Sequence, residues 1–286
     1  MAIKFIIDSA SDVLPEEAAK AGVIHVPMMV RFGDTEYLDT VDLTHREFYE
    51  KLIESDTLPA TSQVPPAIFE QIFSEATANG DTAIMITISS SLSGTYQSAC
   101  LAASTFNGKV RVIDSDSVCV GERILLEMGL KLQAEGVTDP DEMEAALNEA
   151  KGHIRVLALL DTLEYLRKGG RVSGAAAFAG GILGIKPVIT ADHGKVALIG
   201  KARGSKQGNN LLRELVGKVG GIDFSKPFAL AYSGLSDALL QKYIADSAEL
   251  LEEAPDGLPV YTIGCAIGTH AGPGAIAVAF FEKNNP

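Results

Sequence analysis

The segment TAIMITISSSLSGTYQSA, residues 82–99, changes character halfway along its length. Its first seven residues are mostly apolar and rich in Ile, which is typical of a buried β-strand. The residues that follow carry seven hydroxyl groups within positions 89–98, with no charged side chain and no His among them. A strand that leads through a polar turn into a helix is the building unit of an α/β protein. The segment therefore predicts the fold class and places a cluster of neutral hydrogen-bond donors at the end of a strand.

The same strand–turn–helix pattern recurs through the first half of the chain. Strands rich in Val and Ile are expected at 3–8, 23–30 and 110–115, with amphipathic helical patterns between them. One of these helices begins with Thr44 and Glu47, whose spacing is that of a capping box. Alternating strands and helices indicate a mainly parallel sheet, so we expect residues 1–155 to form an N-terminal α/β domain.

The second half of the chain has a different pattern. Two runs typical of strands flank Asp192-His193-Gly194, which predicts an antiparallel hairpin. Helices are expected over 205–219 and 236–253, and a last strand over 274–281. We therefore expect residues 156–286 to form a C-terminal α/β domain with a mixed sheet.

Charge is unevenly distributed in this acidic chain. The 286 residues carry a formal net charge of −13, which argues against general nucleic-acid binding. Between residues 167 and 213, however, nine Lys or Arg residues stand against one acid, Asp192. This basic segment suits an anion or an acidic partner, and a simple solvated surface is the alternative.

Composition predicts a cytoplasmic protein without a membrane-spanning segment. No apolar run reaches the ~18 residues of a transmembrane helix, and the start MAIKFIIDS is too short and too soon acidic for a signal peptide. Cys100, Cys119 and Cys265 are widely spaced, which suggests reduced thiols rather than disulfides or a zinc site. No Walker motif, dinucleotide fingerprint or cluster of metal ligands is recognisable, so no cofactor and no metal are expected.

Three short segments carry the candidate site. Thr61 and Ser62 directly precede a helical pattern, and Ser93 and Gly94 lie where another helix begins. Helix starts expose N–H groups that favour an anion, although hydroxyl residues there are also ordinary N-caps. His270 is expected in a glycine-rich turn before the last strand, where its imidazole can donate to a carboxylate or phosphate.

Seven motifs in order along the chain resemble those of the DegV family of bacterial fatty-acid-binding proteins, which includes the FakB-type subunits of the fatty acid kinase system. They are DSASDV (8–13), ATSQVPP (60–66), SSSLSGTYQSA (89–99), VIDSDSVCVG (112–121), LEYLRKGGRVSG (163–174), KARGSKQ (201–207) and GTHAGPGA (268–275). The resemblance implies two α/β domains with one long-chain fatty acid between and within them. It also implies a carrier rather than an enzyme, which presents the carboxylate to a partner kinase that makes an acyl phosphate from ATP.

The resemblance assigns the carboxylate contacts to Thr61, Ser93 and His270, with Ser62 and the backbone N–H of Gly94 as secondary contacts. Hydroxyl groups, a helix start and one His would hold the anion through charge-assisted hydrogen bonds. We therefore expect no Lys or Arg directly against the carboxylate.

The resemblance also assigns Arg171, Arg203 and Lys206 to a basic surface that faces the kinase and the new phosphate. Two positions depart from the family pattern. Val64 separates Thr-Ser-Gln from the prolines, and Gln207 stands where many members have a second Lys.

The segment AAAFAGGILGIKPVI, residues 175–189, is the expected wall of the acyl-chain tunnel. Its small residues leave room and its larger apolar residues, Phe178, Ile182, Leu183 and Ile185, would line the space. The same composition also fits a tightly packed core helix and strand.

Two other functions remain open from the residues alone. A serine hydrolase would use Ser93 with His270, and Asp114 could complete a triad, but SLSGT lacks the Gly-x-Ser-x-Gly elbow. A binding protein for another small anion, such as a sugar phosphate, would use the basic segment.

Overall fold

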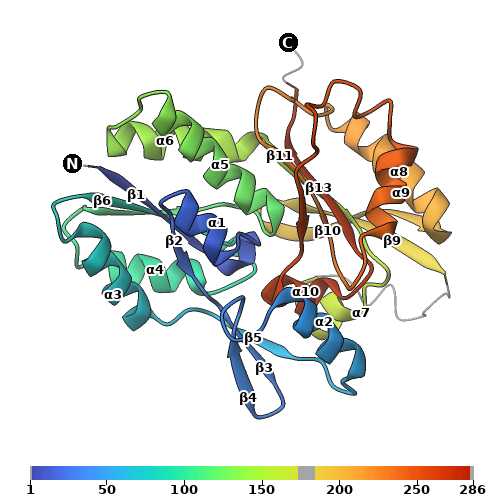
Figure 1. Cartoon of the computed structure of the whole chain (residues 1–286), viewed down its shortest axis with the longest axis horizontal. Helices are drawn as coiled ribbons and strands as arrows, with labels where there is room; N and C mark the ends of the chain where they lie inside the picture. Colours follow the sequence, from blue (N-terminus) through green and yellow to red (C-terminus); the bar gives the residue numbers. More distant parts are fainter. Residues whose placement is uncertain (1, 173–183, 284–286) are drawn as a thin grey trace.

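The computed structural model describes residues 2–172 and 184–283. Two sheets, each with its own helices, lie beside each other, and a small third sheet projects at the bottom of the view in Figure 1. The strand orders are β2-β1-β6-β7, β10-β9-β8-β13-β11-β12 and β4-β3-β5. The expected α/β class, with a parallel and a mixed sheet, is confirmed.

The first sheet is parallel throughout. Its strands are β1 (Ile3–Asp8), β2 (Ile24–Val26), β6 (Thr82–Thr87) and β7 (Val110–Asp114). Two separate apolar clusters cover its faces, one with α3 (Pro66–Thr77) and α4 (Thr95–Ala103), the other with α5 (Val120–Ala134) and α6 (Pro140–Ala150). Burial on both faces explains why its central strands are apolar at nearly every position.

The second sheet is mixed. Its strands are β8 (Ile154–Leu159), β9 (Ile185–Asp192), β10 (Lys195–Arg203), β11 (Phe228–Tyr232), β12 (Val260–Thr262) and β13 (Ile276–Phe281). Among the described strands of this sheet, only β11 and β12 pair in parallel. β8 starts at Ile154, just before the domain boundary expected at residue 156.

Alternation along β8 and β13 separates the two faces of this sheet. Leu157, Leu159, Ile276 and Val278 pack in an apolar cluster with residues of α8 (Gly204–Lys218) and α9 (Ala238–Asp246). The opposite face turns toward α5, which lies between the two sheets (Figure 1). That inner face is where the second sheet meets the first half of the chain.

The segment expected as one strand over 23–30 is divided between two sheets, which corrects the sequence interpretation. β2 ends at Val26, and after Pro27 the chain enters β3 (Met29–Phe32) of the small antiparallel sheet with β4 (Thr35–Leu38) and β5 (Ala60–Ser62). Pro27 has no N–H for a ladder hydrogen bond, and it lies where the chain leaves the first sheet for the small one.

The remaining elements are helices, most of them short. They are η1 (Ser9–Ser11), α1 (Pro15–Lys20), α2 (His45–Glu54), η2 (Lys151–His153), α7 (Glu164–Lys168) and α10 (Cys265–Ala271). The expected hairpin joins β9 to β10, and His193 and Gly194 both have positive φ, as a tight hairpin turn requires. The helix expected over 236–253 ends at Asp246.

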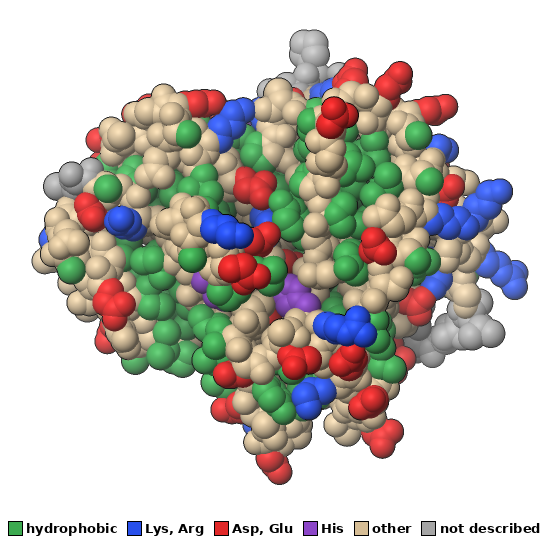
Figure 2. All heavy atoms as spheres, viewed as in Figure 1, with side chains coloured by type: hydrophobic (Ala, Val, Ile, Leu, Met, Phe, Trp, Pro, Cys, Tyr) green, Lys and Arg blue, Asp and Glu red, His purple; other side chains and the backbone are tan. Residues whose placement is uncertain are grey.

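The surface charges follow the uneven distribution in the sequence. In Figure 2, Lys and Arg side chains stand out at the right edge, over the region of α8, β9 and β10, while Asp and Glu are spread across the rest of this face. No helix in the described residues is long and apolar enough to span a bilayer.

Candidate functional site

A cavity of about 290 Å³ lies between the inner face of the second sheet and the loops of the first half of the chain. Its wall is mainly apolar. The contributing residues include Met28, Ile88, Leu92, Val118, Cys119, Val156, Ala158, Leu160, Ile189, Val196, Ile263, Ile267, Ala275 and Ala277. The volume is close to the lower end of the range for small-molecule sites, and the apolar wall suits a hydrocarbon group.

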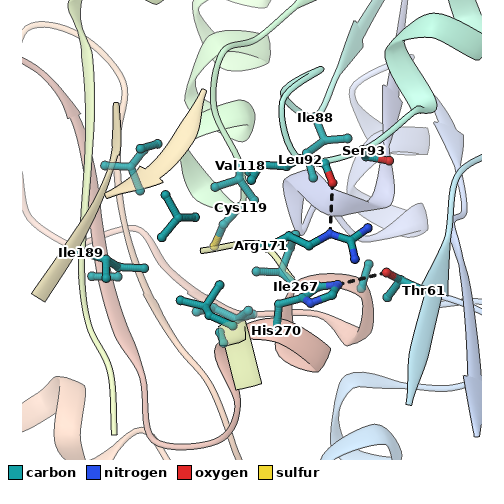
Figure 3. A pocket seen from close by; sticks show the side chains of 18 of the residues that line it. Thr61, Ile88, Leu92, Ser93, Val118, Cys119, Arg171, Ile189, Ile267 and His270 are labelled. Carbon is teal, nitrogen blue, oxygen red and sulfur yellow. Dashed lines mark hydrogen bonds between the residues drawn. The ribbon is translucent and has the colours of Figure 1, made fainter. Parts of the chain in front are cut away.

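Polar groups gather at one end of this cavity. Figure 3 shows Thr61, Ser93, Arg171 and His270 together on the right, with Ile189 at the opposite end. Ser62, Gln63 and Gly94 also line the cavity. The structure thus brings together all five residues that sequence analysis assigned to the carboxylate, and adds Arg171 to them.

Thr61 and His270 are hydrogen-bonded across the site. Thr61 Oγ1 lies 3.0 Å from His270 Nε2. Thr61 comes from β5, whereas His270 comes from the last turn of α10. The placement of His270 in a turn is therefore wrong.

Gly268, which suggested a turn in the sequence, instead has a packing role. A Cβ atom at Gly268 would come within 2.6 Å of the Tyr49 hydroxyl and 2.7 Å of the Phe48 ring. Gly268 therefore allows α10 to pack closely on α2, while Gly272, with φ +70°, ends the helix.

Ser93 and Gly94 form the start of α4, as expected from the sequence. Gly94 is the N-cap, and the Ser93 hydroxyl lies 2.9 Å from the Thr95 hydroxyl. A Cβ atom at Gly94 would overlap the side-chain oxygen of Gln63, whose Nε2 donates to Ser98. A side chain at position 94 would therefore displace the Gln63 amide, which covers the helix start.

Arg171, which the resemblance assigned to a basic surface facing the kinase and the new phosphate, lies in the cavity wall. Its Nε donates to the Leu92 carbonyl at 3.3 Å and its Nη1 to the Gly169 carbonyl at 2.7 Å. Gly170, with φ +71°, turns the chain so that Arg171 points back toward the loop that contains Leu92. Sequence analysis expected no Lys or Arg directly against the carboxylate, and sequence alone does not reveal the turn that brings the Arg171 side chain to the polar end of the cavity.

His270 is neutral at ordinary pH. Burial lowers its pKa, and the nearby Arg171 guanidinium lowers it further, to about 4. The ring nitrogen Nδ1 is buried and has no hydrogen-bond partner among the described residues. A Cβ atom at Gly169 would collide with this ring, so the glycine provides its space. The polar end therefore offers a guanidinium charge, hydroxyl groups and a neutral imidazole, which together suit a carboxylate.

Other predicted residues lie elsewhere. Arg203 and Lys206 are exposed where β10 ends and α8 begins, away from the cavity wall. Ile185 opens β9 and is not among the residues that line the cavity, whereas Ile189 of the same strand is. Phe178, Ile182 and Leu183 fall outside the described residues.

Sequence analysis missed the part of the cavity wall that the second sheet contributes through β8 and the last strand region. Val156, Ala158 and Leu160 line it from β8 and the residue that follows, and Ala275 and Ala277 from the last strand region. The sequence does contain a signal for this part of the wall, because Ala275 and Ala277 are small residues at alternate positions and leave room on one face of the strand. That signal can be interpreted only when the pairing of Ala158 with Ala277 is known.

The geometry of a hydrolase is not formed. The Ser93 hydroxyl pairs with Thr95, and His270 pairs with Thr61. Asp114 accepts hydrogen bonds from the backbone N–H groups of Ser90 and Asp116 rather than from an imidazole. Within residues 2–172 and 184–283, no group of three or more metal-ligating side chains is assembled.

Comparisons with known proteins cover almost the whole chain. Residues 2–283 match a family model described as "Uncharacterised protein, DegV family". A DegV domain-containing protein of Caldanaerobacter subterraneus subsp. tengcongensis is 34% identical over 284 residues, which cover 98% of this chain and 99% of that protein. Protein DegV of Bacillus subtilis is 28% identical over 290 residues, which cover 99% and 100%.

Solved structures share the fold. A DegV family protein from Thermus thermophilus, described by its fatty acid binding, has a TM-score of 0.87 at 30% identity, with 98% of this chain and 100% of that chain covered. A stearic-acid-binding protein from Eubacterium ventriosum has a TM-score of 0.88 at 26% identity, with 98% of each chain covered. The fatty-acid-binding DegV of Bacillus subtilis has a TM-score of 0.83 at 27% identity, with 99% and 100% covered.

Proposed function

Because the chain belongs to the DegV family, we propose that it binds one long-chain fatty acid, with the tail in the apolar cavity and the carboxylate at the polar end. One observation carries this proposal: apart from Thr190, whose hydroxyl donates to the Val156 carbonyl, the polar side chains of an otherwise apolar cavity are gathered at a single end. A fatty acid has the same distribution of polarity. The structural neighbours described with stearic acid and heptadecanoic acid support this choice of ligand.

The tail supplies most of the affinity and the carboxylate supplies orientation. At roughly 0.8 kcal/mol per buried methylene, a tail of about fourteen methylenes contributes on the order of 11 kcal/mol before ordering costs. Each hydrogen bond to the charged carboxylate adds only about 1.5–3 kcal/mol. The tail therefore keeps the fatty acid bound to the protein while the carboxylate is presented to a partner.

The carboxylate would be bound by groups of four kinds. Arg171 neutralises its charge, the hydroxyl groups of Thr61, Ser62 and Ser93 donate to it, and the helix start at Gly94 offers a backbone N–H. His270 contributes an imidazole N–H. This is a stronger anion site than hydroxyl groups alone would make.

We further propose that the bound acid is the substrate of a partner kinase. A carboxylate oxygen of the fatty acid attacks the terminal phosphorus of ATP on the kinase, which gives an acyl phosphate and ADP. The present chain acts as carrier and contributes no nucleophile. Arg203 and Lys206, exposed on the basic segment, suit the docking of an acidic or phosphate-bearing surface. Dependence on ATP places this role in the cytoplasm.

Calorimetry on delipidated protein tests the proposal. Hexadecanoate is expected to bind more tightly than its methyl ester, and a sugar phosphate is expected to give no binding heat. Binding of the sugar phosphate without binding of hexadecanoate would instead establish the small-anion alternative. Stoichiometric labelling of Ser93 by a fluorophosphonate would favour the hydrolase.

A further inference from the structure

The segment that leads into α10 is held by buried side chains from the first half of the chain. His45 Nδ1 lies 2.8 Å from the hydroxyl of Thr262, and the Tyr49 hydroxyl donates to the carbonyl of Ile263 at 2.9 Å. These contacts cross from α2 to the end of β12. They fix the path of the backbone just before the helix that carries His270.

Two carboxylates continue this series of contacts. The N–H of Gly264 donates to Asp12 Oδ1 at 2.7 Å. The next two N–H groups, from Cys265 and Ala266, donate to Asp39 at 3.2 and 3.1 Å, one to each carboxylate oxygen. Asp12 thus holds the residue before α10, whereas Asp39 holds the first two residues of the helix itself.

Asp39 is itself fixed in place. Its side chain is fully buried, and its Oδ2 also accepts a hydrogen bond from the Ser9 hydroxyl at 3.0 Å. Ser9 Oγ in turn accepts the N–H of Met28 at 3.0 Å. A buried carboxylate is tolerated only where its oxygens are hydrogen-bonded, so this arrangement leaves the Asp39 side chain little freedom.

We propose that Asp39 is a positioning residue for the carboxylate site, acting through α10 and His270. The inference rests on the proposed fatty-acid function. α10 has seven residues, so an anchor at Cys265 and Ala266 sets the rotation and depth of the whole helix. Gly268 fixes its distance from α2. Together these contacts hold the His270 ring 3.0 Å from Thr61, a geometry that a shift of about 1 Å would break.

The test compares Asp39→Asn with a matched control, Asp42→Asn. Asparagine keeps the size of the side chain but has one acceptor oxygen and an amide group, so one of the three donors around Asp39 would face another donor. Asp42 lies on the same loop and accepts the N–H of Leu38, but it is exposed. The measured quantity is the affinity for hexadecanoate divided by that for methyl hexadecanoate. This ratio is unaffected by the fraction of protein that is folded.

Asp39→Asn is expected to lower this ratio about tenfold, and Asp42→Asn to leave it unchanged. In a His270→Ala background, Asp39→Asn should produce no further decrease, because both changes then act on the same interaction. An unchanged ratio in Asp39→Asn, or a full additional decrease in the double variant, overturns the inference. If Asp39→Asn does not fold, the same two measurements are made on Ser9→Ala, which keeps the Asp39 carboxylate but removes the hydroxyl that donates to it and accepts the N–H of Met28. A wild-type protein without preference for the acid would instead overturn the proposed function.

Discussion

The Thr61 hydroxyl and the His270 imidazole are joined by a hydrogen bond of 3.0 Å between two parts of the fold. Thr61 is the middle residue of the edge strand β5 of the small sheet, and His270 belongs to helix α10, which follows strand β12 of the second sheet. The polar end of the cavity is therefore complete only when these parts are correctly placed. The affinity for a carboxylate should therefore change when either β5 or α10 is altered.

Replacement of His270 by alanine should weaken binding of the acid selectively. Loss of one hydrogen bond to a charged group costs about 1.5–3 kcal/mol, or roughly a 10- to 100-fold loss of hexadecanoate affinity, while the methyl ester is little affected. Calorimetry with both ligands measures the difference. His193→Ala, at the exposed hairpin tip, is the matched control. Equal losses for acid and ester would refute the role of His270.

The pH dependence of His270 should reveal the bound carboxylate. In the free protein its pKa is lowered to about 4, so the ring stays neutral as the pH falls through the range where an ordinary His is protonated. Between pH ~6.5 and about 4 the unfolded chain takes up a proton that the native protein does not. This residue therefore lowers the free energy of unfolding as the pH falls through that window.

A carboxylate beside the ring favours the charged imidazole, so ligand binding should raise this pKa. NMR titration of labelled histidines measures it with and without hexadecanoate, with His270→Ala to assign the signal. A ring already protonated at pH 6 in the free protein would contradict the burial argument. A pKa that ligand does not change would contradict the contact.

Filling the cavity should change chain-length preference without changing the carboxylate site. Ala158 lines the cavity from near the end of β8, paired with Ala277 and Ile189. In Ala158→Phe, the ring occupies space needed by the tail, and each methylene excluded costs about 0.8 kcal/mol, or roughly fourfold in affinity. Affinities for fatty acids of graded length should peak at a shorter chain than in wild type. Ala78→Phe, on the exposed end of α3, should not shift the peak, and an unshifted peak in Ala158→Phe would place the tail elsewhere.

Arg203→Ala should separate docking from lipid binding. Arg203 is exposed at the end of β10 and does not line the cavity, so the variant should retain its fatty acid. Acyl phosphate formation by a partner kinase should fall about fivefold at low salt, because a peripheral charge contact is worth up to about 1 kcal/mol. Lys218→Ala, at the other end of α8, is the control. Loss of the lipid in Arg203→Ala would count against a docking role.

Sequence predicted the features that depend on neighbouring residues. The strand of residues 82–87, its polar turn and the helix start at Gly94 all follow from local pattern, and the structure places them as expected. The division of residues 23–30 between two sheets depends on Pro27, whose effect could have been foreseen from its missing N–H.

Features set by long-range packing could not be predicted in this way. Arg171 was expected on a basic surface facing the kinase, and it lies in the cavity wall, because the sequence does not show which cations border a cavity. His270 was expected in a turn because its glycines suggested one, whereas Gly268 serves helix packing. The apolar wall comes from strands far apart in the chain, so only the paired sheet assembles it.

Native mass spectrometry of the protein purified from a bacterial host tests the central claim most directly. The account predicts a single adduct with the mass of one long-chain fatty acid, retained by Arg203→Ala and shifted to shorter chains in Ala158→Phe. Reproducible absence of any lipid from the wild-type protein, together with failure to take up added hexadecanoate, would contradict it.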